Sequence, residues 1–213
     1  MRAVAKRTCV GLLAVMASAV ALLSVRYLLP DPLLPAPLMV SHLARWPWVV
    51  MVHVGGGVTA LMLGVFQPVT RKGARRKWHR LAGRVYVLAC LCSAVAGLWL
   101  ALTTSAGPVA SLGFGGLAVV WLFTTTMGWL RVVRGDLIGH RRWMIRSLSL
   151  TLAAVTLRIM IMAAAISGLP FEDAYRAISF LCWVPNLLIA ELWLRSVRTQ
   201  EAGPVGGSDG VSP

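Results

Sequence analysis

Acidic side chains are scarce in this 213-residue sequence, which holds seven Asp and Glu against 21 Lys and Arg. Charged residues of both signs make up only 13%, whereas a soluble domain usually carries about a quarter. None of the acidic residues forms a carboxylate pair within an apolar segment. The sequence therefore disfavours two-carboxylate hydrolysis and carboxylate-bound divalent metals. It also lacks the GxSxG, HExxH, P-loop and dinucleotide-binding motifs of soluble enzymes.

Cysteine is scarce as well, with four in the chain and no CxxC pair. Cys90 and Cys92 are two residues apart, so on a helix they point to nearly opposite sides. We expect all four to be small apolar residues in helices, without a disulfide or metal role.

Long apolar runs dominate the remainder, because 58% of the residues are hydrophobic. A membrane-spanning helix needs about 20 apolar residues. Six segments qualify, at residues 8–29, 48–68, 81–104, 109–130, 146–166 and 176–194. The sequence thus predicts an all-α polytopic transmembrane helical bundle of six spans within a membrane domain at 1–198.

The first span has a second interpretation, since Ala17-Ser18-Ala19 resembles the cleavage site of a signal peptide. The apolar run continues past this site to Val25, which favours a retained anchor. Cleavage would leave five spans.

Most Lys and Arg fall at the amino terminus, in the second and fourth connections and near the carboxyl terminus, which are on one side of the six spans. The most basic run is RKGARRKWHRLAGRVY at 71–86, and GHRRWMIRS at 139–147 is a weaker version. Positive loops stay cytoplasmic. We therefore predict the bacterial inner membrane with both termini cytoplasmic, anionic lipid head groups as partners and no nucleic acid. The oligomeric state stays open.

Two segments look irregular. Residues 29–47 contain five Pro, which predicts an outer loop without a regular helix. Residues 199–213 are rich in Gly, Ser and Pro, which predicts a disordered cytoplasmic tail.

Small or polar residues recur at helical spacing in three spans. They are His53, Gly56, Ala60 and Gly64 in the second; His79, Gly83, Tyr86, Cys90, Ser93, Gly97, Ala101 and Thr104 in the third; and Ser147, Thr151, Ala154 and Arg158 in the fifth. In lipid, such stripes mark close helix contacts. We expect spans two to five to form a four-helix core, with spans one and six peripheral.

Arg158 lies eight residues, or about 12 Å, below the outer end of its span. A charge at this depth is costly unless it is paired or hydrated, although a long Arg partly reaches the surface by snorkelling. His53 lies at nearly the same depth, whereas Glu191 is near the inner end. One hypothesis is therefore a small-solute or ion transporter that uses His53 and Arg158.

His79 and His140 lie before spans three and five, at the inner side. Neutral imidazole is a good haem ligand, so the leading hypothesis is a haem-binding or redox-linked protein with one haem b between them. The only activity that this haem hypothesis would imply is electron transfer in the membrane. The candidate cofactor-binding residues are His79, His140, His53, Arg80, Arg84, Tyr86, Arg141, Arg142 and Trp143. A third hypothesis is a non-catalytic scaffold whose basic loops bind anionic lipid.

Several motifs occur in a recognisable order. They comprise His53, Gly57, Ala60, Leu61, Gly64 and Gln67; His79, Arg80, Gly83, Arg84 and Tyr86; Gly113, Phe114 and Trp121; and His140, Trp143, Met144, Arg146, Ser147 and Arg158. In these residues the chain resembles a family of bacterial integral membrane proteins catalogued as domain of unknown function 2306. The resemblance covers the middle half of the chain and implies a topology and a choice of residues, not a reaction. The four-helix core is also similar to b-type cytochromes at the level of fold, but the outer half offers His53 without a clear second ligand.

Overall fold

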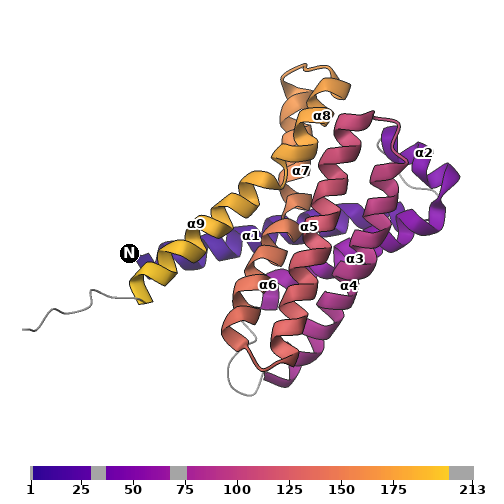
Figure 1. Ribbon diagram of the computed structural model, residues 1–213. Coiled ribbons are helices and arrows are strands. Elements are labelled where there is room, and N and C mark those ends of the chain that lie inside the picture. The colour runs from indigo at the N-terminus through magenta and orange to yellow at the C-terminus, as the bar shows by residue number, and fades with distance from the viewer. Residues whose placement is uncertain (1, 30–36, 68–75, 202–213) are drawn as a thin grey trace, which may run out of the picture.

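The computed structural model describes residues 2–29, 37–67 and 76–201, and the regular elements in these ranges are all helices (Figure 1). Six helical segments are long and apolar enough to cross a membrane, which confirms the predicted all-α polytopic bundle. The first four spans are α1 (Arg2–Val25), extended by the 3-10 turn η1 (Arg26–Leu28), α3 (Pro47–Phe66), α4 (Arg76–Leu102) and α5 (Pro108–Val133).

The fifth and sixth spans are each interrupted, as α6 (Leu137–Thr151) with α7 (Ala153–Ile166), and α8 (Phe171–Leu181) with α9 (Val184–Glu201). Pro185 explains the second break, because proline has no N–H to donate and clashes with the carbonyl four residues earlier. At the first break the Thr151 hydroxyl donates to the Ser147 carbonyl at 2.9 Å. Such back-bonding by Thr bends helices.

Helices α3, α4, α5 and α6 form the core, confirming the four-helix arrangement expected of spans two to five (Figure 1). Helices α3 and α4 approach each other closely, since a Cβ atom on Gly56 would lie 2.8 Å from the Ala89 carbonyl oxygen. Large side chains close the centre, since Tyr86 from α4 and Trp121 from α5 are both buried there. The small-residue stripes therefore are packing seams, as lipid-embedded helices require.

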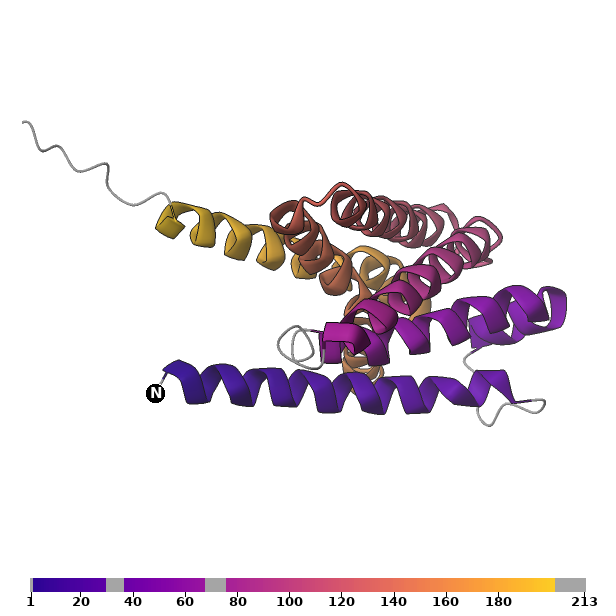
Figure 2. The ribbon, with the colours of Figure 1, turned by 90° about the horizontal axis from the view of Figure 1, so that it is seen from below.

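The flanking spans pack on the core from different sides, as Figure 2 shows for α1 and α9. Helix α1 contacts α3 and α7, whereas α9 contacts α6 and α8. Large apolar residues of both helices, such as Leu22 and Leu192, are exposed in the isolated chain and would face lipid.

Two helices begin earlier than predicted, α4 at Arg76 rather than 81 and α6 at Leu137 rather than 146. His79 and His140 therefore lie in the first turns of helices and not in loops. The apolar content ends at the membrane boundary, but the helix continues beyond it. At α6 the Asp136 carboxylate caps the helix by accepting the Gly139 N–H at 2.7 Å.

The prediction of an irregular outer loop at 29–47 was wrong in its second half, where α2 (Pro37–Arg45) forms. Proline is tolerated in the first helical turn, and residues 38–45 contain none. The tail predicted at 199–213 lies outside the described residues from 202 onward, and α9 continues to Glu201.

Candidate functional site

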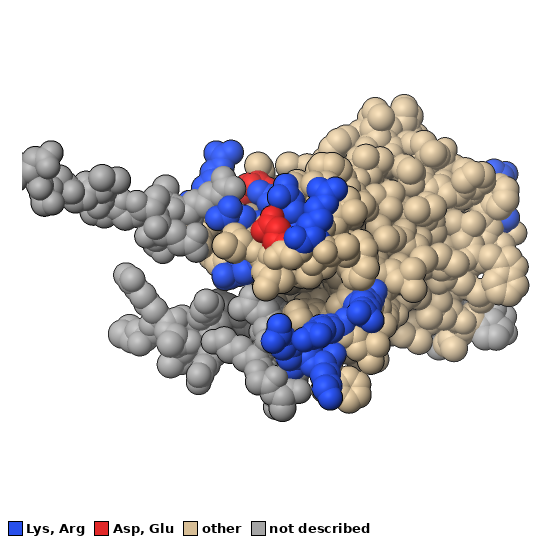
Figure 3. Space-filling view, turned by 60° about the horizontal axis from the view of Figure 1, so that its bottom comes forward, with Lys and Arg blue, Asp and Glu red and all other residues tan. Residues whose placement is uncertain are grey.

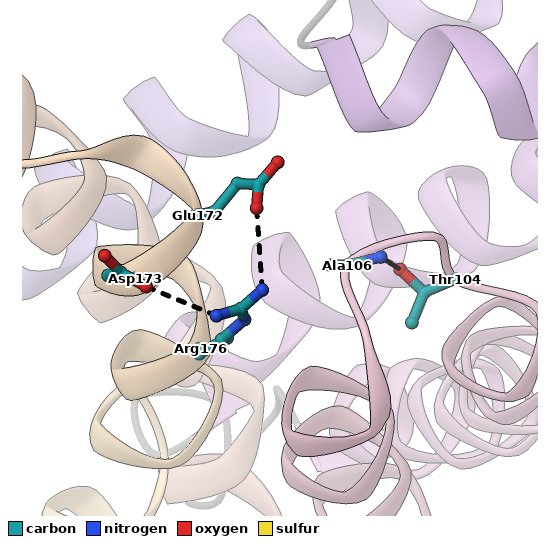
Figure 4. Close-up of polar contacts among 5 residues, drawn as sticks. All are labelled: Thr104, Ala106, Glu172, Asp173 and Arg176. Carbon is teal, nitrogen blue, oxygen red and sulfur yellow. Dashed lines mark hydrogen bonds and ion pairs between the residues drawn. The ribbon is translucent and has the colours of Figure 1, made fainter.

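A cavity of about 240 Å³ lies inside the bundle, among the six spans and α2. At one end it is lined by His42 of α2 and by Thr104, just after α4. It reaches inward to Trp121 and Thr151, near the middle of their spans. The Thr104 hydroxyl accepts the Ala106 N–H at 3.3 Å, which fixes the turn at this far end (Figure 4).

Arg158 and His53 line this one cavity, from α7 and α3. The Arg158 guanidinium donates to the Ser24 hydroxyl at 2.6 Å and to the Ala154 carbonyl at 2.9 Å. Both acceptors are neutral. Tyr27 and a second cation, Arg26, lie close enough to Arg158 to interact with it electrostatically.

The acidic side chains that the structure describes are Asp136, Glu172, Asp173 and Glu191. Each forms an ion pair with an arginine other than Arg158. Arg176 bonds Asp173 at 3.2 Å and Glu172 at 3.5 Å (Figure 4). Asp136 pairs with Arg131, and Glu191 with Arg146 on the neighbouring helix α6. Within the described residues, the Arg158 charge is thus left without a carboxylate partner.

His53 joins α3 to α4 through a reciprocal pair of hydrogen bonds. Its Nδ1 lies 2.9 Å from the Ser93 carbonyl oxygen, and the Ser93 hydroxyl donates to the His53 carbonyl at 2.7 Å. Because a carbonyl only accepts, Nδ1 must carry the proton. The ring packs against Gly97, where a Cβ atom would lie 2.9 Å from it. Nε2 has no partner among the described residues and is available to a ligand.

Hydroxyl groups close the cavity near the middle of the bundle. The Thr151 hydroxyl donates to the Ser147 carbonyl, so Tyr86, 2.9 Å away, must donate to Thr151. Ser147 then donates to Tyr86 at 3.0 Å, and Thr125 donates to Ser147 at 2.8 Å. Trp121 Nε1 adds a bond to Thr151 at 3.2 Å. We call Tyr86, Trp121, Thr125, Ser147 and Thr151 the hydroxyl layer.

The mouth of the cavity carries side chains that sequence reasoning did not select. His42 lies on α2, where burial lowers the pKa of its imidazole and Arg45 lowers it further, so His42 is neutral near pH 7. Ser24 was missed because it lies in an apolar span expected to be peripheral. Tyr175 stacks on Phe171 with ring centroids 5.4 Å apart. None of these positions belongs to a periodic pattern in the sequence, because each is the single polar side chain that its helix contributes to the cavity.

The two candidate haem ligands both lie in the first turns of helices that start at the same end of the bundle, which we call the basic end. His140 Nδ1 lies 2.8 Å from the Gly128 carbonyl oxygen, so it donates there and leaves Nε2 for another partner. The His79 carbonyl accepts a bond from the Gln67 amide at 3.5 Å. Neither of the two described cavities is lined by His79 or His140. Tyr86, the third member of this predicted group, belongs to the hydroxyl layer instead.

Most described Lys and Arg side chains gather at the basic end, where α4 and α6 begin and α5 and α9 end (Figure 3). Arg80, Arg84 and Arg141 are exposed there. Arg142 and Trp143 line an open groove of about 470 Å³.

Beside that groove, the Arg146 guanidinium lies 4.7 Å from the Trp143 ring centroid. Arg146 also forms two hydrogen bonds with Glu191, one of them at 2.9 Å. The groove is thus rich in arginine and partly neutralised by two carboxylates, those of Asp136 and Glu191.

Six apolar spans around a shared core define a polytopic α-helical integral membrane protein. The profile of a family described as "Predicted membrane protein (DUF2306)" matches residues 50–194, which is more than half of the chain. The chain belongs to this family, confirming the resemblance noted in its motifs. Neither the curated proteins nor the solved structures gave a match.

Proposed function

We propose that this protein binds a small solute inside the membrane and transports it, with Arg158 and His53 at the binding site. The observation that supports this proposal is that the two side chains, 105 positions apart in the chain, line one cavity that opens towards the far end and ends at the hydroxyl layer. Intramembrane charges mark substrate or ion pathways when they face a cavity. Helix breaks beside such a site are also common in transporters.

Flux through proteoliposomes tests the proposal, with isotopically labelled solutes of three kinds: neutral glycerol, anionic acetate and cationic methylammonium. Arg158→Ala should abolish the carried flux while the purified variant keeps its helical content. The matched control is Arg176→Ala, which removes an arginine outside the cavity and should leave flux unchanged. A second variant, Ala154→Leu, fills the cavity without removing its charge and should also block flux. Full flux in both cavity variants, or no flux for any solute class, overturns the proposal.

The orientation follows from the charge distribution. We infer that the basic end faces the cytoplasm of a bacterial inner membrane, with both termini on that side, because positive residues are retained there. The concentration of Lys and Arg at the basic end supports this inference (Figure 3). Reporter fusions at residue 75 should be active only in their cytoplasmic form, and a periplasmic signal at this position would reverse the topology.

Haem binding is a second candidate. It is favoured by the hydrogen bond from His140 Nδ1 to the Gly128 carbonyl, because backbone carbonyls commonly orient imidazoles that ligate a metal through Nε2. A bound haem would supply one-electron chemistry. Purified protein should then show a Soret band that shifts on reduction and is lost in His79→Ala and His140→Ala variants. A colourless protein from haem-replete cells rules this candidate out.

A lipid-binding scaffold is the third candidate, supported by the arginine-rich groove at the basic end. Anionic head groups would bind there by charge. Reversal of charge at Arg131 and Arg142, which line this groove, should weaken binding to vesicles that contain phosphatidylglycerol and leave flux unchanged. Unaltered vesicle binding in this variant contradicts a scaffold role for these residues.

A further inference from the structure

We propose that the ligand of the intramembrane cavity is a small organic anion of the monocarboxylate class, bound through its oxygens by the Arg158 guanidinium. This proposal rests on the proposed function, because it names the kind of solute that the cavity takes. Three independent observations support it: charge balance, cavity size and the chemistry of the walls.

The charge balance favours an anion. Among the described residues, Arg158 is bonded only to neutral oxygens, of Ser24 and Ala154, and its side chain lies in a membrane-spanning segment. A guanidinium is effectively always charged, and a buried charge without a partner is unfavourable. Each described carboxylate already has another arginine as its partner. An anionic ligand would complete the site, whereas a cationic ligand would add a second uncompensated charge.

The size of the cavity favours a short molecule. Its volume of about 240 Å³ equals about eight water molecules at the roughly 30 Å³ that each occupies in the liquid. A carboxylate with a short carbon chain fits this space together with one or two waters. Drug-sized ligands usually take larger pockets, of about 300–1,000 Å³.

The walls favour an organic anion over an inorganic one. Apolar side chains line the same cavity as Arg158, among them Val20, Ala21, Phe114 and Leu157. A guanidinium offers a planar fork of donors that matches the two oxygens of a carboxylate. The apolar walls then have a carbon chain to contact, which chloride does not provide.

Equilibrium binding to the full-length protein in detergent micelles tests the class of ligand. The probes are labelled propionate, propionamide and propylammonium, which share one carbon skeleton and differ in charge. Wild-type protein should bind about one propionate per chain, at least tenfold more tightly than propionamide, and should bind no propylammonium. Arg158→Met should weaken propionate binding at least tenfold, whereas Arg158→Lys should retain part of it. Arg176→Met, which removes an arginine outside the cavity, should bind as wild type does.

Several outcomes overturn the proposal. They are equal binding of propionate and propionamide, unchanged propionate binding in Arg158→Met, and displacement of propionate by an equal concentration of chloride. If Arg158→Met fails to fold, the wild-type probe series and the cavity-filling variant Ala154→Leu still decide. Binding of propionate without flux refutes transport but keeps the anion site. Flux of glycerol without propionate binding keeps transport and refutes the anion.

Discussion

Close contact between α3 and α4 makes Gly56 the most informative position for testing the fold. A Cβ atom at Gly56 would lie 2.8 Å from the Ala89 carbonyl oxygen and 2.9 Å from the Ser93 Cβ atom. Neither group is the free end of a flexible side chain, so the two helices must move apart to accept Ala. Overpacking of this kind costs about 1–3 kcal/mol. Because the obstacle includes backbone, we expect Gly56→Ala to lower the free energy of unfolding by about 2–3 kcal/mol.

The neighbouring glycines are matched controls, since they differ only in the direction they face. A Cβ atom at Gly55 meets nothing within 4 Å, and one at Gly57 meets only the Ser93 hydroxyl at 3.5 Å. Ala is about 1 kcal/mol more favourable than Gly in a helix interior. Gly55→Ala should therefore be neutral or stabilise by up to about 1 kcal/mol, and Gly57→Ala should be close to neutral.

The assay is unfolding of the purified protein in detergent micelles, followed by circular dichroism. Gly56→Ala alone should lower the unfolding midpoint. It should also weaken solute binding, because His53 and Ser93 share the same seam and would be displaced with it. Equal midpoints for the Gly55 and Gly56 variants would refute the close packing of α3 against α4, and with it the position of His53 in the cavity.

Four further substitutions test the remaining polar contacts. Tyr86→Phe removes two buried hydrogen bonds. At about 0.6 kcal/mol for each bond in a membrane, this should lower the free energy of unfolding by about 1 kcal/mol in the same assay. A neutral result would show that the bonds are not formed. Asp136, whose pKa is lowered by the hydrogen bond from the Gly139 amide and further by Arg131, should stabilise the protein above pH about 4 and lose this effect as the pH falls through its folded-state pKa. Asp136→Ala should therefore unfold more easily than wild type at pH 7 but not at pH 3, and a difference that persists at pH 3 contradicts this account. Glu191→Gln should lower the free energy of unfolding by about 1–2 kcal/mol. This is less than the roughly 3–5 kcal/mol of a fully buried pair, because the Glu191 side chain is 31% exposed. Glu172→Gln, at an exposed pair, should change stability by under about 0.5 kcal/mol.

The features that sequence predicted well are those that repeat along the chain. Apolar runs of about 20 residues gave the six spans, and stripes of small residues gave the core helices. The hypothesis that His53 and Arg158 line one cavity needed only their depth in neighbouring spans. Each of these features is averaged over several turns, so no single contact decides it.

Features that depend on one contact were not predicted. The break after Thr151 follows from a single back-bonded hydroxyl in a span without proline. Ser24 reaches the site because α1 lies beside α7, which its own sequence does not show. The first turns of α4 and α6 lie before the apolar segments begin. Hydropathy marks the apolar segment and does not show how far the helix continues beyond it. The break after Thr151 and the capped start of α6 depend on single local hydrogen bonds, whereas the place of Ser24 depends on a tertiary neighbour.

The position of the hydroxyl layer bears on how a cavity open at one end could serve transport. Four hydrogen bonds between helices hold the layer: Tyr86 bonds Ser147 and Thr151, Trp121 bonds Thr151, and Thr125 bonds Ser147. At about 0.6 kcal/mol each, four such bonds sum to about 2.4 kcal/mol, which corresponds to roughly 2 per cent of molecules with the layer open. A salt bridge at this depth of the membrane would hold the layer shut far more firmly. Apolar packing alone would leave no polar groups for a solute to pass. Neutral hydroxyls beside a break at Leu152 therefore suit a barrier that must open often without collapsing.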